Sequence, residues 1–420
     1  MFLFNFRKPV LMIIMLNILG YALLAFAGGA LDVNMLYIGG AVTLSLSISY
    51  LIISRMSLQD EYIFLIVAMM FSIGEIMLCR LDPFFAKKQA IWLGISLVCF
   101  FIVYFAVIKL DVWKKLKYTY FAAAVILFVI TLAIGTTIGG SRNWIVIGGI
   151  SIQPSELVKL LIVLMLADRY ANPERYVFKI PKTNITLSAD IVCSVMVYIM
   201  LGFMVLQREW GTSVLIFCVH LSLMFVFSPD RRVMLANTAL ACVGGILGFF
   251  FVSHISVRVD TWLNPWADMA GKGYQITQAL FAIGSGGFFG TGLGLGSPEY
   301  IPEVHSDFIF AAICEEFGVL GGIAVIMLYF MLMYRGIRIS MKISDMFYKC
   351  TAAGISILFG FQAFIILGGV TRFIPLTGIT LPFMSYGGTS LLISFISVGV
   401  LEAAANKVQA QVGGEELEEK

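Results

Sequence analysis

The chain has 420 residues, of which 60% are apolar and 13% are charged, whereas about a quarter of the residues in an average soluble domain carry charge. The 28 Lys and Arg residues nearly balance the 25 Asp and Glu residues, and a net charge of +3 is too small to indicate a nucleic-acid-binding surface. The mean hydropathy is +0.95. These values exclude a soluble globular domain and are typical of a protein with many membrane-spanning helices.

Runs of about 20 apolar residues, the length that crosses a hydrocarbon core about 30 Å thick, recur along the whole chain. They predict an all-α polytopic membrane protein with about twelve transmembrane helices. The predicted spans are 9–28, 34–54, 62–79, 89–108, 118–138, 155–169, 189–207, 211–228, 232–254, 308–334, 350–370 and 383–403. The sixth span is the weakest, because it is short and contains Glu156 and Lys159.

Basic residues predict the orientation of these spans. An even number of spans puts both termini on one side of the membrane. If that side is the cytoplasm, 19 of the 28 Lys and Arg residues lie in inner segments and eight lie in outer segments. Cytoplasmic loops carry an excess of basic residues, so we expect both termini to be cytoplasmic.

One predicted outer connection, residues 256–306, is far longer than the others. Connections of this length are usually functional or disordered. Its aromatic residues and its short apolar stretches favour an ordered loop that folds back onto the helices. A cluster of glycines between Gly284 and Gly296 permits tight turns within it.

Ionisable groups at membrane depth are costly, and each is therefore a candidate functional residue. Asp307 stands where a water-filled outer cavity would meet hydrocarbon, and a carboxylate desolvated there can accept a proton from a sugar hydroxyl. An Asp just before an apolar helix is equally a common N-cap. The residues alone favour neither interpretation over the other.

The other polar candidates have simpler alternatives. Glu156 and Lys159 share a helix face and can form an ion pair that only fixes packing. Arg142 could grip a diphosphate, whereas Arg142 and Trp144 could equally be ordinary interface anchors. Glu209 lies in a short polar turn. The three histidines and seven cysteines form no cluster with metal-ligand spacing, so we expect no protein-bound metal or cofactor.

Four motifs follow one another along the chain. They are Gly140–Trp144 with Gln153–Lys159, Gly271–Gln275 with Gln278 and Ala282–Gly287, Pro302–Phe310 with Glu315–Gly318, and Ile374–Gly378 with Leu381–Ser390. In this order they resemble the SEDS family of FtsW, RodA and SpoVE. The resemblance covers 60–406, which leaves two extra helices in 1–59 and a tail at 407–420 expected to be cytoplasmic.

The resemblance implies a ten-helix core that polymerises lipid II by forming β-1,4 bonds with release of undecaprenyl diphosphate, in division, elongation or sporulation. It implies the bacterial cytoplasmic membrane as the location. It also implies a class B penicillin-binding protein and other divisome or elongasome membrane proteins as partners, with no nucleic acid.

The resemblance also assigns residues. It makes Asp307 the catalytic carboxylate, with substrate binding by Arg142, Trp144, Glu156, Lys159, Glu209, Lys272, Gln278, Ser285, His305, Glu315 and Ser385. Charge on the diphosphate would be offset by Arg142, Lys159, Lys272 or a substrate-borne Mg²⁺ or Mn²⁺.

Three positions depart from the family pattern. Gln207-Arg208-Glu209-Trp210-Gly211 stands where the family usually has Gln-Pro-Asp-Leu-Gly, Ile366 replaces an asparagine, and Asn264 replaces an aspartate. These changes leave the subfamily open. A lipid II flippase and a non-catalytic scaffold for a penicillin-binding protein are the rival functions. A transporter would need a site near the midplane, whereas the richest motifs here are predicted to lie on the outer face.

Overall fold

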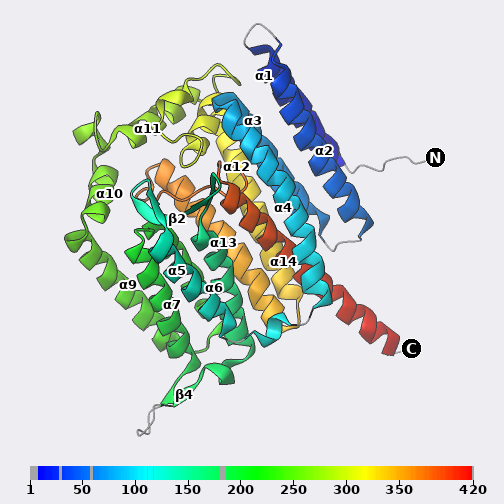
Figure 1. Ribbon diagram of the computed structural model, residues 1–420, viewed down its shortest axis with the longest axis vertical. Helices are drawn as coiled ribbons and strands as arrows, with labels where there is room; N and C mark the ends of the chain where they lie inside the picture. The colour runs from blue at the N-terminus through cyan, green and yellow to red at the C-terminus, as the bar shows by residue number, and fades with distance from the viewer. Residues whose placement is uncertain are drawn as a thin grey trace. The chain divides into compact units, whose positions relative to one another are not determined.

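The computed structural model describes residues 8–27, 31–56, 60–110, 112–116, 118–179 and 186–418, with side chains as far as Asn406 (Figure 1). Most of these residues are helical. The helices are α1 (Lys8–Ala27), α2 (Val33–Arg55), α3 (Glu61–Leu81), α4 (Pro83–Lys109), α5 (Thr119–Ile134), α6 (Pro154–Ala171), α7 (Ala189–Leu206), α8 (Trp210–Phe227), α9 (Arg231–Phe251), α10 (Ser253–Leu263), α11 (Tyr274–Gly286), α12 (Ile309–Lys342), α13 (Met346–Val370) and α14 (Gly388–Glu418). Short 3-10 helices are η1 (Trp113–Lys115), η2 (Pro173–Tyr176), η3 (Pro265–Asp268) and η4 (Pro298–Tyr300).

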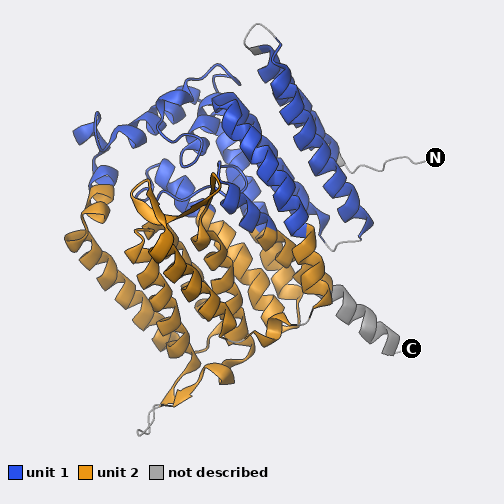
Figure 2. Cartoon of the chain, in the orientation of Figure 1, with its two compact units in different colours: residues 1–100, 260–332, 363–395 blue, residues 101–259, 333–362, 396–420 orange. Residues whose placement is uncertain are grey.

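The chain forms two compact units, coloured separately in Figure 2. Unit 1 comprises residues 1–100, 260–332 and 363–395, and unit 2 comprises 101–259, 333–362 and 396–420. Each unit is therefore assembled from segments that are far apart in the sequence.

Each of the twelve predicted spans coincides with a helix. Ten of these helices are long and apolar enough to cross a membrane, counted over the described residues. The chain is therefore a multi-pass membrane protein. The two remaining helices are α5, which is shorter, and α6, which carries four charged residues. The count of twelve crossings stays a prediction, as does the sidedness of the termini. The side chains of the expected tail, 407–420, lie outside the described residues.

Five short strands are the part of the fold that we did not predict. β1 (Thr136–Ile138), β2 (Ser141–Ile147) and β3 (Ile150–Ile152) form an antiparallel sheet, and β4 (Phe178–Lys179) pairs with β5 (Thr186–Leu187). The pairs Gly139-Gly140 and Gly148-Gly149 connect the first three strands, and all four glycines have positive φ. Two-residue hairpin turns of this kind require positive φ at both positions, so the Gly-Gly pairs were the signal in the sequence.

Polar side chains at the helix starts explain several boundaries. Asp60 accepts the Tyr62 N–H at 3.2 Å and Asp82 accepts the Phe84 N–H at 2.8 Å, so both carboxylates satisfy donors that have no intrahelical partner. Pro154 occupies the first turn of α6, where a missing N–H costs nothing.

Several helix ends differ from the predicted spans: α4 begins at Pro83 rather than 89, and α12 extends to Lys342 rather than 334. The span expected at 383–403 begins only at Gly388, because 381–387 is irregular and makes hydrogen bonds to other segments of unit 1. The span expected at 308–334 is interrupted at Gly318, whose φ of 68° and ψ of −169° are not helical. The long stretch 256–306 contains most of α10 together with η3, α11 and η4.

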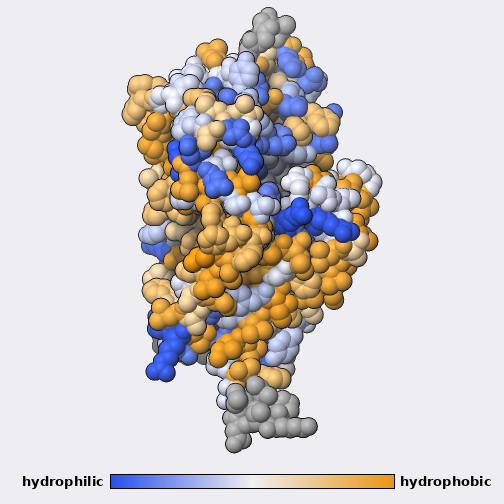
Figure 3. Space-filling view, turned by 90° about the vertical axis from the view of Figure 1, so that its left-hand side faces the viewer, coloured by the Kyte–Doolittle hydropathy of each residue, from blue (hydrophilic) through white to orange (hydrophobic). Residues whose placement is uncertain are grey.

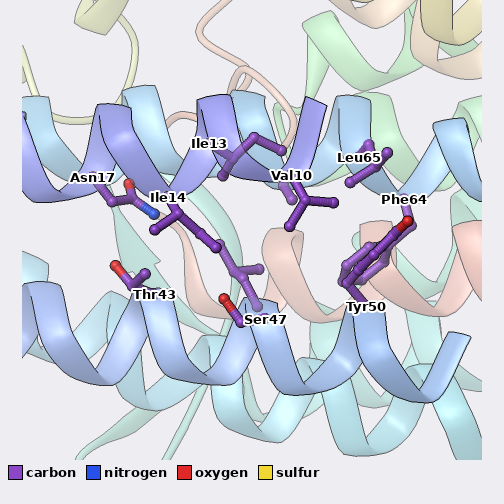
Figure 4. Close-up of a pocket in the computed structure, with 11 residues that line it drawn as sticks. Val10, Ile13, Ile14, Asn17, Thr43, Ser47, Tyr50, Phe64 and Leu65 are labelled. Carbon is purple, nitrogen blue, oxygen red and sulfur yellow. The ribbon is translucent and has the colours of Figure 1, made fainter. Parts of the chain in front are cut away.

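Within unit 1, α3 is buried along most of its length. It contacts the 381–387 segment at Gly74, where an added Cβ would lie 2.5 Å from the Met384 carbonyl oxygen. The N-terminal helices pack against it, and a small space remains between α1, α2 and α3. Figure 4 shows Asn17 of α1 and Thr43 and Ser47 of α2 facing that space.

Hydrogen bonds join the first turns of α12 to the glycine-rich segment before it, and an ion pair joins them to α3. The Glu316 carboxylate accepts from Arg80 Nε at 3.0 Å and from the Gly294 N–H at 3.0 Å, and its side chain is fully buried. The Gly318 backbone approaches this segment so closely that a Cβ would lie 2.4 Å from Gly290 N. The turn at Gly318 therefore depends on the absence of a side chain.

The outer surface fits a lipid environment. Hydrophobic residues cover most of the face in Figure 3, and hydrophilic residues gather in separate clusters among them. Many large apolar side chains of the candidate spans are exposed, among them Leu23, Ile102 and Phe250. Such surface would be unfavourable in water and is favourable against lipid.

We expect Gly318→Ala to lower the free energy of unfolding by at least about 2 kcal/mol, because its backbone conformation is accessible only to glycine and the added Cβ would clash. Thermal unfolding of the purified protein in detergent measures this. Gly94→Ala is the matched control, since a Cβ there meets nothing within 4 Å. Equal melting temperatures for the two variants would contradict the strain argument.

We expect Glu316→Ala to destabilise the protein by about 3–5 kcal/mol, because it leaves the Arg80 guanidinium without its buried partner. Glu299, also near Arg80 at 3.7 Å, has a side chain that is 56% exposed. Glu299→Ala should therefore cost no more than about 1 kcal/mol. Thermal unfolding compares the two variants. A loss of stability in Glu299→Ala as large as that in Glu316→Ala would refute the argument that burial makes the Glu316 pair important.

Candidate functional site

Asp307 lies in a turn of unit 1, two residues before α12 begins. The Asp307 and Ser306 N–H groups both donate to the Glu303 carbonyl, at 3.2 and 3.1 Å. The next residue, Phe308, is completely buried, whereas Asp307 itself is partly exposed. Phe308 therefore anchors the turn in the protein interior, whereas Asp307 remains partly accessible to solvent or substrate.

A second irregular segment, 381–387, holds this turn in place. The Ser385 hydroxyl donates to the Ser306 carbonyl and accepts the Leu381 N–H at 3.0 Å, and the Tyr386 N–H donates to the His305 carbonyl at 2.8 Å. Backbone polar groups beside apolar helices must be satisfied internally. Ser385, a predicted site residue, is thus in direct contact with the segment that carries Asp307.

The start of α4 holds both segments. Gln89 is buried, donates to the Ser385 carbonyl at 3.0 Å and accepts the Gly387 N–H at 3.2 Å. Phe85, one turn earlier, stacks on the His305 ring with centroids 4.2 Å apart. Gln89 and Phe85 were not predicted as site residues, because nothing in their local pattern separates them from ordinary residues of an apolar span.

His305 is enclosed by aromatic rings. It stacks on Phe85 and meets the edge of Tyr386 at 5.9 Å. Burial lowers the pKa of His305 below its ordinary value, although Glu303 and Asp82 act in the opposite direction. The neutral imidazole is therefore favoured near neutral pH, and His305 is better suited to positioning the turn by stacking than to supplying positive charge.

Each of the two irregular segments contains one strained backbone position. Four residues other than glycine have positive φ in the described structure, namely Arg208, Glu303, Arg372 and Phe383. Glu303 begins the turn that carries Asp307, Phe383 precedes Ser385, and Arg208 precedes Glu209. Each such residue costs about 1–3 kcal/mol and persists only where its surroundings hold it, as they do at many functional sites.

The remaining predicted residues of unit 1 lie on other elements. Lys272 is exposed in the turn before α11, and its N–H donates to Asp268 at 3.0 Å. Gln278 and Ser285 lie on α11. Glu315 accepts the Ser297 N–H at 2.8 Å and is buried. Its carboxylate therefore holds the glycine-rich segment in place, a contact that the sequence could not indicate.

In unit 2, Glu209 is the centre of a buried polar cluster. One carboxylate oxygen accepts from Asn143 Nδ2, from Gln153 Nε2 at 2.6 Å and from the Ser155 hydroxyl at 2.8 Å. The other oxygen is buried without a hydrogen-bond partner in the described structure. Burial raises the pKa of Glu209, while the three donors act to lower it. The interpretation of Glu209 as a plain polar turn residue was wrong, because this carboxylate is only 6% exposed.

Lys159 and Glu156 form the predicted ion pair. Lys159 Nζ lies 2.7 Å from Glu156 and 3.2 Å from the Gln362 side-chain oxygen, and both charged side chains are buried. A buried pair is weak evidence for stability, because desolvation offsets much of the attraction. The pair therefore fits a packing role and a binding role equally well.

Arg142 and Trp144 lie on β2. The exposed Arg142 guanidinium donates to the Gly135 carbonyl at 3.1 Å and to the Ala133 carbonyl at 3.4 Å, at the end of α5. Trp144 pairs with Thr136 across the sheet. Arg142 thus contacts carbonyls that the helix end leaves without partners, and it keeps an exposed face.

No group of three or more His, Cys, Asp or Glu side chains that could hold a metal ion occurs in the parts of the chain that the structure describes.

Comparison with known proteins identifies relatives over most of the chain. The family model for FtsW, RodA and SpoVE, described as "Cell cycle protein", matches residues 49–410. The peptidoglycan glycosyltransferase RodA of Mycobacterium bovis is 33% identical over 81% of this chain and 77% of its own length. Stage V sporulation protein E of Bacillus subtilis is 34% identical over 76% of this chain and 86% of its own length. A probable peptidoglycan glycosyltransferase FtsW of Coxiella burnetii is 36% identical, covering 70% and 79%.

Solved structures share the fold. A chain of a peptidoglycan synthase complex that coordinates polymerization and crosslinking superimposes with a TM-score of 0.69 at 24% identity, covering 83% of this chain and 98% of that one. The rod-shape-determining protein RodA of Thermus thermophilus gives a TM-score of 0.61 at 25% identity, covering 83% and 96%. Because the family model spans most of the sequence and the relatives exceed 30% identity, this chain belongs to the SEDS family of FtsW, RodA and SpoVE.

Proposed function

We propose that this chain is a peptidoglycan glycosyltransferase that polymerises lipid II, with Asp307 as its catalytic carboxylate. The observation that carries the assignment is the anchoring of the Asp307 turn. Hydrogen bonds from Ser385 and Tyr386 and the stack of His305 on Phe85 fix its backbone, while Asp307 itself stays partly exposed. A rigidly held, accessible carboxylate is what general-base catalysis requires.

In the proposed reaction Asp307 removes the proton from the 4-hydroxyl of the acceptor GlcNAc. The oxygen then attacks C1 of the donor MurNAc and forms a β-1,4 bond with inversion. The C1–O bond to undecaprenyl diphosphate breaks, and the diphosphate leaves with the electron pair. The proton remains on Asp307 until it is lost to water.

The leaving diphosphate requires compensating positive charge. We propose Lys159, whose buried ammonium is held by Glu156 and Gln362, as one cation for this role. Arg142 and Lys272 are exposed cations that could bind phosphate oxygens. A Mg²⁺ or Mn²⁺ ion carried by the diphosphate would serve the same purpose. The proposal assigns Glu209, Trp144, Gln278, Ser285 and Glu315 to shaping the substrate site.

We propose that the chain lies in the bacterial cytoplasmic membrane with both termini in the cytoplasm, since the basic residues are biased towards those segments. A class B penicillin-binding protein is the proposed partner. The likeness to a chain of a peptidoglycan synthase complex supports this.

We expect Asp307→Asn to reduce polymerisation of labelled lipid II by at least about 100-fold, because the amide cannot accept the proton. The assay uses full-length protein in liposomes, alone and with a cognate class B penicillin-binding protein. Glu299→Gln is the matched control, since it removes an exposed carboxylate from the same unit and should leave the rate unchanged.

Equal glycan product from Asp307→Asn and the native chain would exclude Asp307 as the base. Product from neither protein, with the partner present, would favour a flippase or a scaffold, and a lipid II translocation assay on the native chain then separates these two.

We expect Lys159→Gln to lower the polymerisation rate by about ten- to a hundredfold, because a charged hydrogen bond to the diphosphate is lost. Lys159→Arg should recover part of the rate. Thermal unfolding is measured on the same samples. A lowered melting temperature with an unchanged rate would show that the pair with Glu156 only fixes helix packing.

A further inference from the structure

A groove between α2 and α4 in unit 1 has no role in the proposed reaction. It has a volume of about 630 Å³, within the range of about 300–1,000 Å³ that is usual for small-molecule sites. Tyr37, Ile38 and Ala41 of α2 line one side, and Phe84, Lys87 and Ile91 of α4 line the other. Because α2 lies outside the ten-helix core that the family resemblance implies, the groove exists only through the extra N-terminal helices.

The walls of the groove are mostly apolar, and several of the side chains that line it are exposed. Tyr37, Phe84 and Ile91 are 73%, 58% and 59% exposed. Both helices are long and apolar enough to cross a membrane, so these side chains face hydrocarbon. An acyl chain is the natural neighbour of such a surface.

Polar and positively charged side chains accompany these apolar residues. Asn34 and Lys87 line the groove, and the ammonium of Lys88, the next residue, lies 4.2 Å above the ring of Phe84, a lining residue. Both lysines are exposed, and neither is within ion-pair distance of an acidic side chain in the described structure. One cation in the groove, a second beside it and an amide donor match a phosphate group.

These features point to a membrane lipid rather than a partner helix. A helix packed here would have to cover Lys87 and Lys88, which have no acidic partner in the described structure, whereas a phospholipid places its anionic headgroup beside them and its acyl chains between the apolar walls. Tyr37, Phe84 and Ile91 are exposed in the groove, so lipids of the membrane can reach it directly.

The same turns of α4 that line the groove also hold the candidate catalytic turn. Phe84 packs edge-on against Phe85 at 5.7 Å, and Phe85 stacks on His305. Gln89, two residues after Lys87, binds the carbonyl of Ser385. A ligand that shifts the first turns of α4 therefore acts on the segment that carries Asp307.

We infer that the groove between α2 and α4 is a binding site for one anionic glycerophospholipid, and that this lipid modulates the catalytic turn through Phe84 and Phe85. The binding step stands independently of the proposed polymerase activity, whereas the modulation rests on it.

Native mass spectrometry of the full-length protein with dioleoyl phosphatidylglycerol, dioleoyl phosphatidylcholine or undecaprenyl phosphate tests the binding step. We expect one retained phosphatidylglycerol, with affinity at least about fivefold lower in Lys87→Glu. Ala90→Trp, which fills the groove, should weaken binding as well. The matched controls on the same helix are Lys109→Glu and Ile102→Trp, which do not line the groove and should retain the lipid.

Three outcomes would overturn the binding site. They are equal retention by the groove variants and the controls, preference for phosphatidylcholine, and displacement of phosphatidylglycerol by a lower concentration of undecaprenyl phosphate, which would make the groove a prenyl-lipid site. If both controls retain phosphatidylglycerol and Lys87→Glu loses it, the result supports the lipid site in the groove, even if Ala90→Trp fails to fold.

Polymerisation in liposomes with increasing phosphatidylglycerol tests the modulation. The native rate should change by at least about twofold over the titration, and the rate of Lys87→Glu should not, while the two rates agree in pure phosphatidylcholine. Parallel responses of the native protein and Lys87→Glu would refute the modulation and leave the binding result standing. If the native protein forms no glycan at all, the proposed function fails, and the mass-spectrometric result still decides the lipid site.

Discussion

Gln89 uses both ends of its side-chain amide to bind irregular backbone at Ser385 and Gly387, and this interaction holds the candidate site together. Irregular backbone beside apolar helices is stable only if its polar groups are satisfied within the protein. Ser385 in turn binds the Ser306 carbonyl. A chain of hydrogen bonds thus runs from a helix interior to the residue next to Asp307, and each link is buried or partly buried.

Close backbone approach is the second requirement of this arrangement. The 381–387 segment reaches α3 only because Gly74 has no side chain, and the first turns of α12 accommodate the glycine-rich segment only because Gly318 adopts a conformation closed to other residues. Glu316 and Glu315 then secure that segment by accepting its N–H groups. These glycines and carboxylates therefore fix the backbone around the candidate site.

Unit 2 also contains buried charged side chains that are held by hydrogen bonds. Glu209 accepts three hydrogen bonds through one oxygen, and Lys159 is shared between Glu156 and Gln362. Buried charges of this kind are expensive unless they are hydrogen-bonded, and they give a site a preorganised electrostatic environment. The replacement of the usual aspartate by Glu209 keeps a carboxylate at this position, and the longer side chain reaches donors from β2 and α6.

Much was determined by the sequence alone. Hydropathy located a helix in each predicted span, because apolar runs of membrane length are a local property, and four motifs identified the family. Contacts between distant segments were decided only by the tertiary structure. The pairing of Gln89 with Ser385 joins residues 296 positions apart, and that of Arg80 with Glu316 joins residues 236 apart. The groove between α2 and α4 likewise depends on which helix faces meet, and the periodicity within one helix does not determine which helix packs beside it.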